Sequence, residues 1–174
     1  MRHLVLISAL LAPLTACVAP PREQAPPPAP IVQRPSPVPT TAPLASDWQD
    51  WPLTPGSWSY GRDARGTRAM FGQANTDARL VLRCDMAERR IYLSRAGSDT
   101  GALTVRTSSA TRALPVQPTG GALPYVATAL PVRDPLLDAM AFSRGRIVVE
   151  QAGSPPLVVP SWAEIARVTE DCRA

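Results

Sequence analysis

A proline-rich segment divides the chain and limits where a folded domain can form. Residues 18–46 hold ten prolines but few large apolar side chains. So few apolar residues cannot bury enough surface to fold, and the segment is expected to be an extended, polyproline-like tether. The alternative is a proline-rich ligand for a partner domain. Residues 17–46 are therefore assigned to a lipidated cysteine and its tether, and one domain is left for residues 47–174.

The segment before the tether has the features of an export signal. Arg2 gives a positive start, an apolar run covers residues 4–14, and small residues lead to Cys17. This run is too short for a permanent membrane helix, which needs about 20 residues. Residues 1–16 are therefore predicted to be a signal peptide.

The end of this signal, "LTAC" at 14–17, resembles the lipobox of bacterial lipoproteins. The resemblance implies cleavage before Cys17, followed by acylation of its sulfur and of its new amino group. Two or three acyl chains anchor a protein stably, because each buried methylene contributes about 0.8 kcal/mol. By the same resemblance, Val18 rather than aspartate favours the outer membrane, with the domain in the periplasm. The alternative is an ordinary signal peptide that ends near a chance cysteine.

Once Cys17 is set aside, the cysteines left are Cys84 and Cys172. An even pair in an oxidising compartment predicts one structural disulfide. In the chain-entropy model, a loop of this length is stabilised by up to about 4–5 kcal/mol. A zinc site would need further ligands, and a redox pair would be expected closer together, as in CxxC. We therefore expect a disulfide and no metal.

The composition argues against most catalytic chemistry. The 18 basic residues are all arginine, and the one histidine, His3, lies in the leader. The mature chain therefore has no lysine for a Schiff base and no imidazole to act as a general base or metal ligand. Ser143 lies in "AFSRGR" without a G-x-S-x-G elbow, so we interpret it as part of a helix-terminal loop. The protein is expected not to be an enzyme and to need no cofactor.

Two pairs of carboxylates keep a hydrolase open as the least favoured alternative. Asp134 and Asp138 lie four residues apart on a predicted helix, where they are interpreted as an N-cap and a first-turn charge. Glu170 and Asp171 precede the last cysteine, and no second carboxylate pairs with them in the sequence.

Alternating apolar and polar residues predict strands through most of the domain. The clearest windows are 78–84, 89–95, 102–108 and 146–151. Turn-forming residues separate them at 85–88, 96–101, 118–121 and 152–156. Spacing of about ten residues with short turns predicts an antiparallel sandwich or barrel. Cys84 is expected on the inward side of its strand.

Two short helices are expected as well, which makes the fold mainly β at the α+β border. In the first, over 133–145, Asp134 is the expected N-cap, Pro135 the first helical residue and Gly145 the stop. Its expected buried stripe is Leu136, Leu137, Met140 and Ala141. In the second, over 160–172, Ser161 and Glu164 form a predicted capping box. Its expected buried face is Trp162, Ile165 and Val168.

Two groups of side chains are candidate binding surfaces. The first is the aromatic group Trp48, Trp51, Trp58 and Tyr60, interpreted as core packing or, alternatively, as a surface for a partner or glycan. The second is a set of strand arginines expected to face outward and to meet lipid head groups, lipopolysaccharide or a cell-wall polymer: Arg79, Arg83, Arg90, Arg95 and Arg106. Since the domain balances 15 arginines against 13 acids, a solvated face is favoured and nucleic acid is not expected.

The segments "DPLLDAMAFSRGR" (134–146) and "LVVPSWAEIARVTEDCR" (157–173), with Cys84 and Cys172, resemble a family of small lipoproteins and secreted proteins of sphingomonad-type alphaproteobacteria. That family has no assigned activity. A more distant resemblance is to exported β-sandwich proteins of the invasion-associated locus B type, whose additional cysteines this chain lacks.

These observations favour a lipid-anchored envelope lipoprotein that acts as a binding or structural module. Its expected partners are the lipid bilayer and either an envelope protein or a cell-wall polymer. The second hypothesis is an inhibitor or accessory factor of an envelope enzyme. It predicts an exposed loop that enters the partner's active site, with 96–101 or 66–72 as the candidates.

Overall fold

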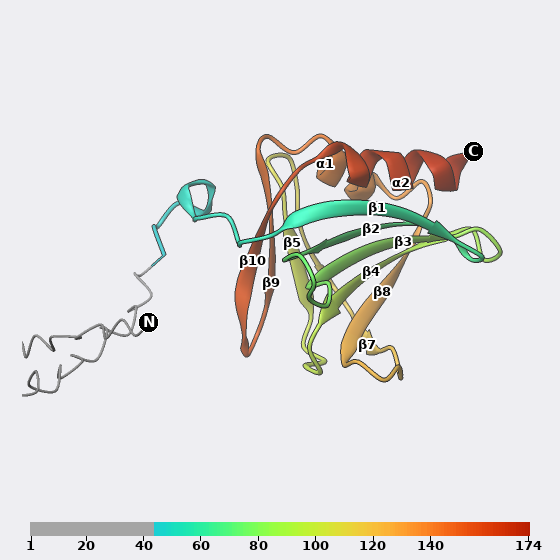
Figure 1. The fold of residues 1–174 in the computed structure, drawn as a ribbon. Coiled ribbons are helices and arrows are strands. Elements are labelled where there is room, and N and C mark those ends of the chain that lie inside the picture. The colour runs from blue at the N-terminus through green and yellow to red at the C-terminus, as the bar shows by residue number, and fades with distance from the viewer. Residues whose placement is uncertain (1–43) are drawn as a thin grey trace, which may run out of the picture. The chain divides into compact units, whose positions relative to one another are not determined.

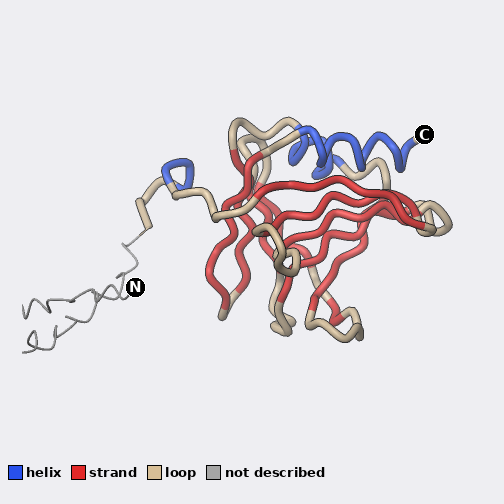
Figure 2. Tube along the Cα trace, viewed as in Figure 1, coloured by secondary structure: helices blue, strands red, loops and turns tan. Residues whose placement is uncertain are grey.

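The computed structural model describes residues 44–174, drawn as a coloured ribbon in Figure 1. The signal peptide, Cys17 and the tether as far as residue 43 lie outside the described residues. Within 44–174, antiparallel strands form two open sheets and two α-helices lie along one side (Figure 2). The predicted class, mainly β with two short helices, is confirmed, and the strands form two sheets rather than a closed barrel.

The larger sheet, sheet A, has six strands in the spatial order β1-β2-β3-β4-β8-β7. Their bounds are β1 Ser57–Asp63, β2 Gly66–Gly72, β3 Leu80–Asp85, β4 Arg90–Ala96, β7 Gln117–Pro118 and β8 Tyr125–Pro131. The smaller sheet, sheet B, has four strands in the order β10-β9-β5-β6. Their bounds are β5 Leu103–Arg106, β6 Thr111–Leu114, β9 Arg146–Gln151 and β10 Ser154–Pro160.

The four strands predicted from alternation are present as β3, β4, β5 and β9. Cys84 and its apolar neighbours on β3 are buried on one face, as period two requires. Strict alternation in the window 146–151 would place Val148 on the wet face of β9, opposite Ile147 and Val149, but Val148 is fully buried. It pairs with Val158 on β10, and Thr54 hydrogen-bonds to the main chain of Val158. The segment that enters the domain therefore bonds to the edge of β10 beside this buried pair.

The segment 66–72, proposed above as an exposed loop, is instead strand β2 between β1 and β3. Its inward residues Thr67, Ala69 and Phe71 are buried, while the residues between them are half-buried. This alternation is the signature of a strand that packs one face on a core. The prediction of a loop here was therefore wrong.

The core lies between the inner faces of the sheets and under the helices. Trp58 on β1 is buried and packs against Phe71, with ring centroids 5.4 Å apart. Its indole Nε1–H donates a hydrogen bond of 2.8 Å to the carbonyl oxygen of Pro160 on β10. One side chain thus joins an edge strand of sheet A to an edge strand of sheet B.

Arg95 on β4 makes a second link between the sheets and corrects another expectation. It was assigned to the outward arginines, but it is only 3% exposed. Its guanidinium donates to the carbonyl oxygens of Val149 and Pro155, which belong to sheet B. Arg95 is in phase with the buried Ile91 and Leu93, so strict alternation places it inward. Burial lowers the pKa of Arg95.

Helix α1 (Pro135–Ala141) begins as predicted: Pro135 is at the start and the Asp134 side chain accepts a hydrogen bond from the Leu136 amide. The expected stripe faces the core, with Leu136, Leu137 and Met140 buried and Ala141 packed at its margin. The helix ends at Ala141, so the prediction that Gly145 stops it is wrong; Gly145, at φ +79°, lies in the loop that leads to β9.

Helix α2 (Ala163–Arg173) lies over the inner face of sheet A beside α1 (Figure 1). The predicted capping box is wrong, because the Ser161 hydroxyl donates to the carbonyl oxygens of Met140 and Ala141 at the end of α1. Trp162 is 46% exposed instead of buried, whereas Ile165 and Val168 are buried as expected. Neither helix within 44–174 is long and apolar enough to cross a membrane.

The predicted disulfide between Cys84 and Cys172 is confirmed. Cys84 lies on the inner face of β3 and Cys172 in the last turn of α2, with their Cα atoms 5.5 Å apart. Both cysteines are buried. The bond therefore fixes the C-terminal helix to the middle of sheet A.

Candidate functional site

The structure does not bring the four predicted aromatic residues onto one surface. Trp58 belongs to the core. The Tyr60 hydroxyl donates to Asp171 over 2.7 Å, and the Arg167 guanidinium lies 3.9 Å above the Tyr60 ring. Trp48 opens the short 3-10 helix η1 (Trp48–Asp50), and Trp51 directly follows it. Of these side chains, Trp51 borders a groove on the outer face of sheet B.

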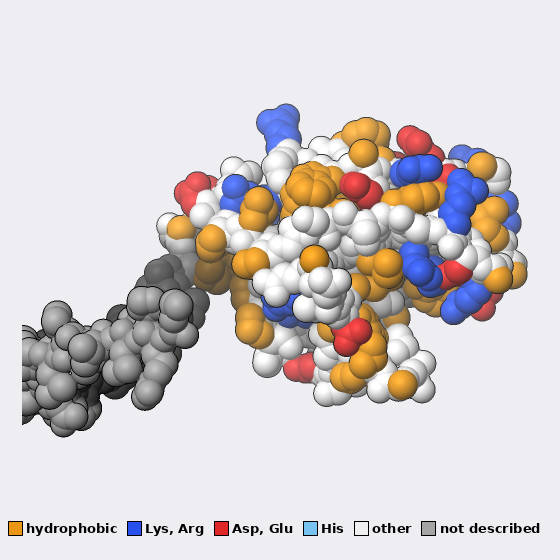
Figure 3. All heavy atoms as spheres, in the orientation of Figure 1, with side chains coloured by type: hydrophobic (Ala, Val, Ile, Leu, Met, Phe, Trp, Pro, Cys, Tyr) orange, Lys and Arg blue, Asp and Glu red, His pale blue; other side chains and the backbone are white. Residues whose placement is uncertain are grey.

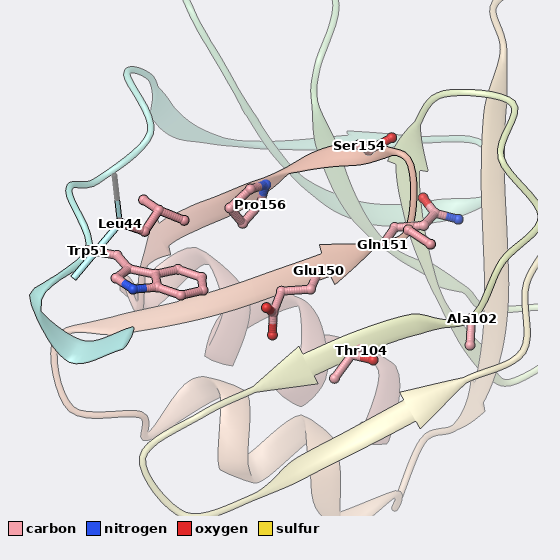
Figure 4. Close-up of a pocket in the computed structure, with 9 residues that line it drawn as sticks. Leu44, Trp51, Ala102, Thr104, Glu150, Gln151, Ser154 and Pro156 are labelled. Carbon is pink, nitrogen blue, oxygen red and sulfur yellow. The ribbon is translucent and has the colours of Figure 1, made fainter. Parts of the chain in front are cut away.

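This sheet-B groove has a volume of about 530 Å³, within the range of about 300–1,000 Å³ common for small-molecule sites. Figure 4 shows its residues, which come from the entry segment, from β5 and from the β9–β10 hairpin. They are Leu44, Trp51, Ala102, Thr104, Glu150, Gln151, Ala152, Ser154 and Pro156. The groove is thus apolar at the tryptophan end and more polar toward the hairpin.

Trp51 is held in place at two points. Its indole Nε1–H donates 2.6 Å to the carbonyl oxygen of Ala45, and its own carbonyl oxygen accepts from the guanidinium of Arg146. The preceding turn is closed by Asp47, whose side chain accepts from the Gln49 amide. These bonds fix the orientation of the indole, which lies along the groove (Figure 4). The Trp51 side chain is half-buried.

The floor of the groove is the outer face of β5 and β9. Thr104 and Glu150 are cross-strand partners there. The Glu150 carboxylate accepts from Arg106 through Oε2 over 3.1 Å, and the Glu150 side chain is 32% exposed. The ion pair therefore orients the carboxylate without removing it from solvent.

The turn predicted at 96–101 borders the polar end of the groove and forms the connection from β4 to β5. Gln151, itself buried, donates from Nε2 to the carbonyl oxygens of Asp99 and Gly101, over 2.6 and 2.9 Å. The Asp99 side chain in turn accepts from the Gly101 amide. The turn is therefore well anchored, while Ser98 and Thr100 are exposed.

A second hollow, of about 520 Å³, lies on the outer face of sheet A, with Arg65 and Arg83 among its lining residues. Arg65 pairs with Asp85 at 2.7 Å, and Arg83 pairs with Asp63 at 2.8 Å. The hydrogen bonds from Arg83 and Arg65 lower the pKa of Asp63 and of Asp85, respectively. Both arginines are thus paired with acids and do not form a single-sign patch. Figure 3 likewise shows acidic and arginine side chains mixed over the right-hand part of the face in view.

The other strand arginines likewise do not converge. Arg79 and Arg90 are exposed singly, and Arg106 is paired with Glu150. Neither the paired arginines of sheet A, Arg65 and Arg83, nor Arg106 of sheet B forms a cluster of guanidinium groups that could bind an anionic polymer.

The candidate carboxylates are paired with arginines as well. Asp134 pairs with Arg112, and Asp138 forms two hydrogen bonds with Arg173. Burial alone would raise the pKa of Asp134, but the hydrogen bonds from Arg112 and from the Leu136 amide lower it below its usual value. Asp134 is thus held as an anion, whereas a general acid needs a raised pKa.

Ser143 is buried, and its hydroxyl donates to the Arg146 carbonyl oxygen and accepts from the Ser108 amide. Both bonds close the loop after α1, in line with its interpretation as a loop residue. Within residues 44–174, no three histidine, cysteine or acidic side chains come together as a metal site.

Scans against protein-family models, curated proteins and solved structures returned no match. Alternation placed Thr104 and Glu150 on outward faces, but no feature of the sequence signalled that β5 and β9 are neighbours or that Trp51 lies across them.

Proposed function

We propose that this protein is a cell-envelope lipoprotein, anchored through an acylated Cys17, whose disulfide-bonded domain acts as a binding module. The observation that carries the proposal is the disulfide itself. Cys84 and Cys172 are bonded to each other, and the third cysteine of the sequence is Cys17, at the end of the predicted export signal. Structural disulfides form in exported proteins, and in the lipobox that residues 14–17 resemble, the cysteine is the acceptor for lipid.

Binding is favoured over catalysis by the character of the sheet-B groove. It offers an oriented indole, hydroxyl groups and one carboxylate, which are groups that position a ligand. The groove has one acid and lacks a second ionisable partner for proton transfer among its lining residues. The outer membrane is the proposed location, with the domain in the periplasm.

Fractionation of cells tests the anchor. Wild-type protein is expected in the membrane fraction, and Cys17→Ser should move it to the soluble fraction. The matched control is Cys84→Ser combined with Cys172→Ser, which removes the other two cysteines and their disulfide and should leave the protein on the membrane. An unchanged distribution of Cys17→Ser would contradict the proposal.

A role as an inhibitor or accessory factor of an envelope enzyme is the second candidate, and the anchored turn at 96–101 favours it. A loop that is already ordered loses little entropy when it enters a partner's site. Ser98→Arg in this turn should abolish co-purification of a stoichiometric envelope enzyme. If no such enzyme co-purifies with the wild-type protein, this candidate fails.

A further inference from the structure

We infer that the sheet-B groove binds an uncharged glycan, with a sugar ring stacked on Trp51 and its hydroxyl groups bonded to Thr104 and Glu150. This inference rests on the proposed binding function and names the ligand class for its site. It is carried by the orientation of the indole, by the polar pair on the floor and by the charge of the lining residues.

The indole of Trp51 can offer a ligand only its ring face. Its Nε1–H is already used by the carbonyl oxygen of Ala45. Leu44 and Pro156 flank it in the groove, and Figure 4 shows the ring between the entry segment and strand β9. A ring that is fixed before binding costs little entropy to use. Its electron-rich face suits the apolar C–H face of a pyranose ring.

The floor supplies partners for hydroxyl groups. Thr104 and Glu150 lie side by side on adjacent strands, and the hydroxyl can donate or accept while the carboxylate accepts. Ser154 provides a further hydroxyl toward the hairpin. A ligand with an apolar face and several hydroxyl groups matches this combination better than a wholly apolar ligand, which would cover the partly exposed carboxylate without offering it a hydrogen bond.

An extended peptide fits less well, because the groove runs over the face of the sheet. Strand addition needs free backbone groups at an edge. The nearest edge, β10, carries Pro155 and Pro156, which have no N–H to donate. Recognition in this groove must therefore come from side chains.

The charge of the lining residues selects an uncharged ligand. Glu150 is the one charged residue among them. Arg106 pairs with Glu150, and Arg146 hydrogen-bonds to the Trp51 carbonyl oxygen without lining the groove. A phosphate or carboxylate on the ligand would face the Glu150 anion with no cation among the lining residues, which is unfavourable.

Calorimetric titration of the purified mature protein with chitotetraose and cellotetraose tests the inference. Saturable binding of at least one of them is expected. Trp51→Ala should weaken it by at least about tenfold, the loss of one aromatic contact, and Thr104→Val should weaken it without changing the fold. Trp162→Ala is the matched control, because that indole is exposed on α2 outside the groove, and it should bind as wild type. Cooperative thermal unfolding of each variant excludes a folding defect.

Three outcomes would overturn the inference. The first is the absence of saturable binding to both sugars, and the second is wild-type affinity in Trp51→Ala. The third is Trp51-dependent binding of a proline-rich peptide in place of the sugars, which would assign the groove to a polypeptide. None of these outcomes would affect the proposed membrane anchor. The anchor is tested separately, by fractionation of the Cys17→Ser variant, and that result does not depend on the groove.

Discussion

The Trp58 indole and the Pro160 carbonyl oxygen, 102 residues apart in the chain, form a buried hydrogen bond of 2.8 Å between the edge strands of the two sheets. The indole also fills the core against Phe71. The bond closes one side of the sandwich, because β1 and β10 belong to different sheets and share no ladder.

Trp58→Phe is expected to keep most of the packing but to remove the indole hydrogen bond, while the Pro160 carbonyl oxygen keeps its bond from the Trp162 amide. The net loss of one buried hydrogen bond costs about 0.5–1.5 kcal/mol. Urea denaturation should show this loss in the free energy of unfolding. Trp162→Phe, at the exposed tryptophan, should change it by less than about 0.5 kcal/mol. Equal losses in both variants would show that the interstrand bond contributes nothing.

Reduction of the Cys84–Cys172 bond should destabilise the domain. The loop it closes spans 88 residues, and loss of a native disulfide from a small exported domain costs about 2–5 kcal/mol. Denaturation with and without a reductant measures the difference. The Cys84→Ala, Cys172→Ala double variant should match the reduced protein and no longer respond to reductant. If the reduced protein were as stable as the oxidised protein, the disulfide would not stabilise the domain.

Arg95 should be intolerant of conservative replacement. Its planar guanidinium reaches two carbonyl oxygens of sheet B, and a lysine ammonium cannot reproduce that fork. Arg95→Lys is expected to lower the free energy of unfolding by about 1–3 kcal/mol. Arg79→Lys, at an exposed arginine, is the control and should be neutral. Equal stability of the two variants would contradict the link between the sheets.

Acid should weaken the domain through Asp63 and Asp85. Hydrogen bonds from Arg83 and Arg65 hold the pKa of these carboxyls below the unfolded value of about 3.9. Their contribution is therefore complete above about pH 4 and is lost as pH falls through the folded pKa. Urea midpoints measured against pH should decline in that acidic window. Asp85→Asn should show a shallower decline than the wild type. Identical profiles would show that Asp85 does not contribute to the loss of stability in acid.

Much of the fold could be predicted because period-two alternation is strong in β3, β4, β5 and β9. It was weaker elsewhere: β8 ("YVATALP") places alanines on its outer face, and β10 ("SPPLVVP") begins with prolines. Val148 was misassigned because a strand can be buried on both faces when another segment covers it. The predicted N-cap at Ser161 was wrong because the Ser161 hydroxyl donates instead to carbonyl oxygens at the end of α1. The local sequence does not reveal such a tertiary contact.

The candidate site was less accessible to prediction for a related reason. Trp51 and Trp58 are both aromatic residues near the start of the domain, and the sequence does not distinguish them, yet Trp58 is buried in the core. Only strand order brings Thr104 next to Glu150 and puts Trp51 at the end of that pair. Pairing between strands 40 or more positions apart depends on the whole sheet, as the register of Thr104 with Glu150 shows.

The most direct test of the central claim is intact-mass and peptide mass spectrometry of the mature protein extracted from membranes without reductant. The account predicts a chain that begins at Cys17 with acyl groups on its sulfur and amino nitrogen, together with a peptide pair linked through Cys84 and Cys172. An unmodified amino terminus, or free thiols at those two cysteines, would contradict it.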